Sequence, residues 1–107
     1  MINEMAKECV KIAREHGFSQ LEDITDITDD NKWYIAGKLA LIHSEVSEML
    51  EELRVGNKQG IIKEGIDVLI RTFELLIAFE GTDIEEELYK KMTINRFREH
   101  KHGGKLI

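Results

Sequence analysis

The sequence predicts an all-α protein, a four-helix bundle that is completed by oligomerisation. The chain has no proline, the strongest helix breaker, and its apolar residues recur with the 3.6-residue period of helices. Its 107 residues fit a single domain over 1–107, and a domain this small buries a smaller fraction of its surface than a large one. A partner subunit would therefore add much to the core.

The first helix is expected over residues 2–16, where Gly17 ends it, and residues 17–30 form a long acidic connection. A connection this long in a small domain is often functional. The second helix is expected over 31–55. One stripe of this helix is apolar at helical spacing and predicts packing against other helices, and it comprises Leu39, Ile42, Val46, Met49, Leu50 and Leu53.

The third helix, expected over 59–80, is apolar around most of its circumference. Its clear polar stripe consists of Glu64, Asp67, Arg71 and Glu74. A 107-residue monomer has few other helices to surround such a helix, so part of it is expected to form a subunit interface. The fourth helix is expected over 83–99, because Thr82 and Glu85 have the spacing of a capping box.

Composition and charge exclude several classes of protein. Hydrophobic residues at 42% and charged residues at 34% are ordinary for a globular domain and exclude disorder. A net charge of −6 argues against nucleic acid as a partner. Cys9 is the sole cysteine and no run resembles a signal peptide or a membrane span, so a soluble, cytoplasmic protein without a membrane partner is expected.

Two carboxylate pairs are the candidate metal ligands. Glu45 and Glu48 are three residues apart on the second helix, and Glu64 and Asp67 repeat that spacing on the third. If these helices pack antiparallel, the pairs can face each other across the seam. Mg²⁺ prefers such oxygen ligands, and Mn²⁺ can substitute for it. Because the metal ion supplies positive charge between the two, a negatively charged protein can then bind a phosphate-rich molecule.

Acidic helix faces are more often simply solvated, and the neighbouring residues weigh against that interpretation here. The residues four positions after Glu45, Glu48 and Glu64 are Met49, Glu52 and Val68, none of which is a cation. Among the four carboxylates, only Asp67 has such a partner, Arg71. His43 lies beside the acidic row, but a lone histidine on a helix is more often structural than a ligand.

The segment KLALIHSEVSE (Lys38–Glu48) followed by EGIDVLI (Glu64–Ile70) resembles the MazG-like nucleotide pyrophosphohydrolases of the all-alpha NTP pyrophosphatase superfamily. Their hallmark is a Glu-x-x-Glu helix followed, after a short hairpin, by a Glu-x-x-Asp helix. The run KMTINR (Lys91–Arg96) and the closing HGGK (His102–Lys105) also resemble the end of that family's domain. This sequence departs from the family in having Val46-Ser47 where a glycine is common and Gly65 where alanine is usual.

The resemblance implies hydrolysis of a nucleoside triphosphate between its α and β phosphates by a homodimer or homotetramer. Cleansing of the nucleotide pool is the role expected of such an enzyme. The resemblance also implies that Mg²⁺ is held by Glu45, Glu48, Glu64 and Asp67, and Glu48 is the candidate that orients or deprotonates the attacking water. By the same carry-over, the residues expected to contact phosphates are Lys38, Lys91, Asn95 and Arg96. Trp33, beside Tyr34, is a candidate to stack on the nucleobase, and so, with less support, is Phe18.

The sequence leaves a second class of function open. A non-catalytic helical oligomer could use the same helices as a nucleotide sensor or a protein-interaction module, with its acidic rows facing solvent. His100 and His102, with Lys101 and Lys105, form a basic tail that would either close over phosphates or remain a solvated terminus.

Overall fold

The computed structural model describes residues 1–18 and 20–98, and in this part of the chain it contains four helices and no strand. The helices are α1 (Ile2–Glu15), α2 (Lys32–Arg54), α3 (Lys58–Ile77) and α4 (Ile84–Arg96). The predicted all-helical class is confirmed. The first helix begins where predicted, and the other helix ends differ from the predicted ones by one to three residues. The basic tail and the HGGK run lie outside the described residues. Within those ranges, no helix has the length and apolarity that crossing a membrane requires.

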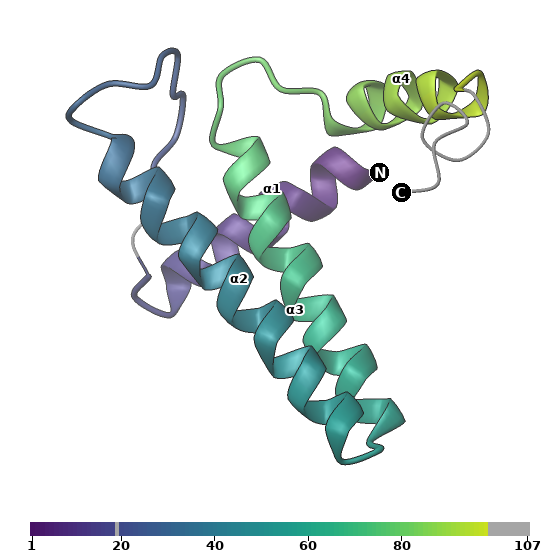
Figure 1. The fold of residues 1–107 in the computed structure, drawn as a ribbon. Helices are drawn as coiled ribbons and strands as arrows, with labels where there is room; N and C mark the ends of the chain where they lie inside the picture. Colours follow the sequence, from purple (N-terminus) through teal and green to yellow (C-terminus); the bar gives the residue numbers. More distant parts are fainter. Residues whose placement is uncertain (19, 99–107) are drawn as a thin grey trace.

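Helices α2 and α3 form a long antiparallel hairpin (Figure 1). Gly56 ends α2 with a positive φ of 70°, and the amide of Asn57 donates to the Glu52 carbonyl at 2.9 Å, which is the Schellman arrangement. The Asn57 side chain then caps α3 by accepting from the Gly60 amide at 3.0 Å. This tight turn fixes which residues of the two helices lie opposite each other.

Helix α1 packs across α3 near the open end of the hairpin (Figure 1). The connection after it returns to the same place, where Ile24 pairs with the end of α3: its amide donates to the Ala78 carbonyl, and its carbonyl accepts from the Glu80 amide, both at 2.9 Å. Ile24 is buried with Ile35, Leu75 and Ala78 in a small core. The long connection is therefore anchored at its centre.

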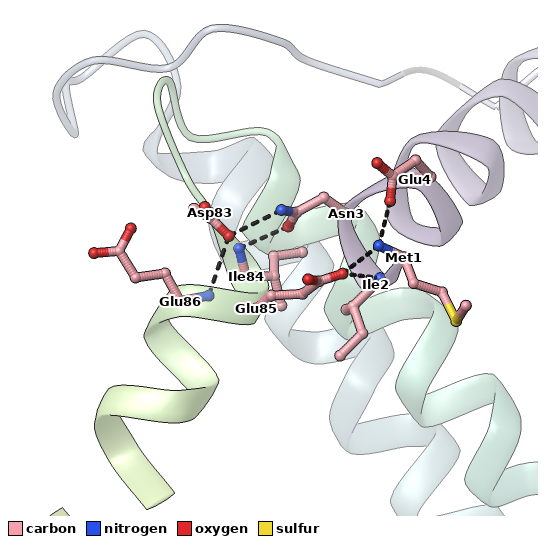
Figure 2. Close-up of polar contacts among 8 residues, drawn as sticks. All are labelled: Met1, Ile2, Asn3, Glu4, Asp83, Ile84, Glu85 and Glu86. Carbon is pink, nitrogen blue, oxygen red and sulfur yellow. Dashed lines mark hydrogen bonds and ion pairs between the residues drawn. The ribbon is translucent and has the colours of Figure 1, made fainter. Parts of the chain in front are cut away.

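The beginnings of α1 and α4 are locked together by polar contacts (Figure 2). Asn3 accepts from the Ile84 amide at 2.7 Å and donates to Asp83 at 2.9 Å. Glu85 accepts from the Met1 amine and the Ile2 amide. These contacts occupy amides that the first turn of a helix leaves without partners, so each helix caps the other.

The predicted cap of α4 is wrong by one residue. The N-cap is Asp83, whose carboxylate accepts from the Glu86 amide at 3.1 Å, and not Thr82. Glu85, which the capping-box spacing assigned to Thr82, instead holds the start of α1. A contact between distant segments thus decides between two adjacent residues that can both serve as caps.

The chain is open rather than close-packed. Its accessible surface is 8440 Å², whereas a folded monomer of its 12.4 kDa mass would expose roughly 6,100 Å². The radius of gyration is 16.3 Å, against about 13 Å for a compact domain of similar length. Helix α4 extends away from the hairpin (Figure 1). Several large apolar residues of α2 and α3 are also exposed, among them Leu50, Leu53 and Leu69.

Candidate metal and phosphate site

Three of the four predicted carboxylates meet across the α2–α3 seam. One carboxylate oxygen each from Glu45, Glu48 and Glu64 lies within 4.8 Å of the others, and we call these residues the acidic trio. Oε2 of Glu45 and Oε2 of Glu64 are buried and accept no hydrogen bond from the described part of the chain. Burying a carboxylate oxygen without a partner is costly, whereas a cation would satisfy it. The trio therefore has the donor chemistry of a site for a hard divalent ion.

The trio also perturbs its own protonation. Glu45, and after it Glu48, favours a proton on Glu64 by accepting a hydrogen bond from it, with burial and like-charge repulsion adding to the effect. Together they raise the pKa of Glu64 from 4.5 to about 7. At neutral pH, the protein thus keeps part of its population with one proton in the trio, which a bound cation would displace.

We expect this raised pKa to make the metal-free protein less stable as the pH rises. Between about 4.5 and 7 the folded state holds a proton on Glu64 that the unfolded state has released, so the free energy of unfolding falls over this window. The Glu64 contribution is complete below the unfolded pKa and lost above the folded one. Urea unfolding in EDTA at pH 5 to 8 measures it, and Glu64→Gln should flatten the profile. Parallel profiles for the two proteins would contradict this assignment.

Asp67, the fourth predicted ligand, is not part of the trio. It lies three residues after Glu64 on α3, is exposed, and lines a cavity of about 340 Å³ between α1 and α3. Three residues turn a helix by 300°, so a side chain at that spacing is rotated by about 60° from the one before it. Glu64 faces α2, and Asp67 is turned toward α1. Its role as a ligand stays a prediction.

Two cations extend the polar seam beyond the trio. Arg71, two turns after Glu64, places its Nε 3.5 Å from Oε1 of Glu45. Lys38, two turns before Glu45, places its Nζ 3.6 Å from Oε2 of Glu74, and both residues of this pair are buried, with 7% and 3% of their surfaces exposed. The sequence pattern placed Arg71 and Glu74 in a polar stripe and gave Arg71 as the helix partner of Asp67, but it assigned neither residue to the site. Lys38 and Glu45 are seven residues apart, as are Glu64 and Arg71, and residues seven apart lie on the same face of a helix. This spacing is the sequence signal that Lys38 and Arg71 continue the site.

A second cavity of about 340 Å³ adjoins these cations, and we call it the aromatic cavity. Phe18, Trp33 and Tyr34 line it together with Gly37, Lys38, Leu41 and Arg71. The Lys38 ammonium lies 5.5 Å from the centre of the Tyr34 ring, a cation–π distance. The structure therefore places the three predicted stacking residues, Trp33, Tyr34 and Phe18, around one space that also reaches the predicted phosphate contact Lys38.

The remaining predicted site residues lie elsewhere. Lys91, Asn95 and Arg96 are exposed on the far half of α4, which within one chain points away from the hairpin (Figure 1). His43 is exposed and is not in the trio. Cys9 lies in the α1–α3 cavity, where burial and then the charge of Glu74 raise the pKa of its thiol. A thiol held in its neutral form packs rather than reacts.

Fold and site together define an all-helical protein with an acidic cluster between two antiparallel helices, a cluster that could hold a metal ion. Comparisons of the chain with protein-family models, with curated proteins and with solved structures find no match.

Proposed function

We propose that this protein is a Mg²⁺-dependent nucleoside triphosphate pyrophosphohydrolase, an enzyme that converts a nucleoside triphosphate and water to a nucleoside monophosphate and pyrophosphate. The observation that carries the proposal is the convergence of Glu45, Glu48 and Glu64 from consecutive antiparallel helices, with two of their oxygens buried and unpartnered. These are hard oxygen donors, which suit Mg²⁺ and also accept Mn²⁺. The resemblance to MazG-like pyrophosphohydrolases supports the same reaction.

The acidic trio, with Asp67 as the proposed fourth ligand, would hold the metal. When bound, Mg²⁺ supplies positive charge that offsets the charge growing on the phosphoryl oxygens and makes a water molecule more acidic. Glu48, the exposed member of the trio, accepts the proton of the attacking water. The water oxygen bonds to the α-phosphorus, the bond from that phosphorus to the bridging oxygen breaks, and pyrophosphate leaves with the bonding electrons.

The neighbouring residues give the substrate an orientation. The aromatic cavity offers Trp33, Tyr34 and Phe18 for stacking on a nucleobase. Arg71 lies between that cavity and the trio, and Lys38 lines the same cavity. A nucleotide whose base enters the aromatic cavity would thus direct its phosphates past cationic groups toward the carboxylates.

A second copy of the chain would complete the enzyme. The protomer exposes roughly 2,300 Å² more surface than a folded monomer of its mass, an amount in the range that stable homodimers bury. In such an assembly, Lys91, Asn95 and Arg96 on the extended α4 would contribute to the site of a partner subunit, where they would contact phosphates. This arrangement would give the exposed α4 a purpose that it lacks within one chain.

The test is a panel of NTPs and dNTPs incubated with the protein and Mg²⁺, with pyrophosphate and the monophosphate as products. We expect at least one nucleotide to yield both in equal amounts, with no release in EDTA. Calorimetry with Mg²⁺ and a non-hydrolysable triphosphate separates the alternatives. Binding without turnover would identify a nucleotide sensor, and absence of metal-linked binding would identify a protein-interaction module.

A further inference from the structure

Arg71 lies where the trio meets space that is open to a ligand. Its side chain lines both the aromatic cavity and the α1–α3 cavity. Its Nε is buried and has no hydrogen-bond partner in the described part of the chain, and its ion-pair partner there is Glu45. A guanidinium in this position can reach the trio from one side and a bound molecule from the other.

The contact between Arg71 and Glu45 is loose. At 3.5 Å, the Nε–Oε1 distance exceeds the 2.7–2.9 Å of a good charge-assisted hydrogen bond, and the Nε proton forms no such bond. Oε2 of the same Glu45 is also without a partner. The pair therefore offsets charge in the trio without satisfying either residue, so both groups remain available to better partners.

A divalent ion in the trio would compete with Arg71 for Glu45. The metal ion and the guanidinium would then both lie beside the Glu45 carboxylate. Repulsion between these two cations would weaken the ion pair of Arg71 with Glu45. Phosphate oxygens are the better partner for a guanidinium, because its planar fork can donate to two of them at once. Lys38 does not have this freedom, since it is enclosed with Glu74.

Resting on the proposed function, we propose that Arg71 is a phosphate-binding residue that pairs with Glu45 in the metal-free protein and exchanges that carboxylate for a nucleotide phosphate once metal binds. Because of this exchange, Arg71 has opposite effects on the affinity for metal and on the affinity for nucleotide. Arg71 opposes metal binding in the absence of nucleotide, and it favours nucleotide binding in the presence of metal.

The experiment measures both effects on Arg71→Gln at pH 8, above the pKa of Glu64. Mn²⁺ titrated by calorimetry without nucleotide should bind about fivefold more tightly than to the wild type, because a competing charge is gone. The KM for a nucleotide that the wild type hydrolyses should rise about tenfold or more, because charged hydrogen bonds to phosphate are lost. Arg71→Lys, which keeps the charge but not the fork, should leave Mn²⁺ binding near wild type and still raise KM.

Arg54→Gln is the matched control, because Arg54 also forms an ion pair with a glutamate of α2, Glu51, at 3.1 Å on the exposed surface. It should change neither quantity. Weaker or unchanged Mn²⁺ binding by folded Arg71→Gln, verified by circular dichroism, would overturn the inference. If Arg71→Gln does not fold, an unchanged KM in Arg71→Lys overturns it. If no wild-type turnover is found, the proposed function fails, and the Mn²⁺ titration still decides whether Arg71 competes with metal.

Discussion

Glu48→Gln is expected to lower the rate of pyrophosphate release at least 100-fold at saturating Mg²⁺. The amide keeps the shape of the side chain but removes the negative charge that holds the metal and the group that takes the proton from water. Even residues that only support metal ligands cost about 10–100-fold when they are changed, so a ligand with a catalytic role should cost more. A 100-fold loss corresponds to about 2.7 kcal/mol of transition-state stabilisation.

Glu52→Gln is the matched control for this variant. Glu52 continues the same acidic row of α2 one turn beyond Glu48, yet it is not part of the trio. Its rate should stay within about twofold of the wild type, as for surface changes away from a site. Thermal unfolding in EDTA separates folding from function, because removing one charge from the trio should raise the melting temperature of Glu48→Gln while its activity falls. Equal rates for Glu48→Gln and the wild type would refute the assigned role.

The helices and all three residues of the trio could be predicted, because they depend on local signals. Apolar periodicity located α2 and α3, and the glycine at position 56 marked the turn between them. Once a short turn joins two antiparallel helices, acids near both sides of the turn must come together. The spacing alone did not show that Asp67 is turned toward α1 while Glu64 faces α2, since that depends on how three helices pack around α3.

The features that sequence reasoning missed depend on contacts between distant segments. Lys38 and Glu74 are separated by most of the hairpin, and neither has a sequence neighbour that predicts burial of the pair. The anchoring of Ile24 on the end of α3 follows from two backbone hydrogen bonds, which any residue type can make. The cap of α4 shifted to Asp83 because Asn3 of α1 supports that position. The local sequence pattern does not indicate which distant residue contacts which.

Leu69→Asp is expected to convert an assembled protein to a monomer. Leu69 belongs to a stripe of α3 that is about half exposed in the single chain and repeats at helical spacing: Ile62, Ile66, Leu69 and Leu76. In the described ranges, only seven hydrophobic residues are buried within the protomer. Wild-type protein should therefore sediment as a dimer or tetramer. A charge placed in a desolvated interface should weaken association at least 100-fold, about 2.7 kcal/mol.

Sedimentation velocity over a range of micromolar concentrations measures this effect, with Gln59→Asp as the control. Gln59 is an exposed polar residue of the same helix, so that variant adds the same charge outside the apolar stripe and should assemble as the wild type does. A monomeric wild type across the range would contradict the proposed assembly. If α4 of a partner subunit supplies phosphate contacts, the Leu69→Asp monomer should also lose turnover while it retains Mn²⁺ binding by the trio, because all three trio carboxylates come from one chain.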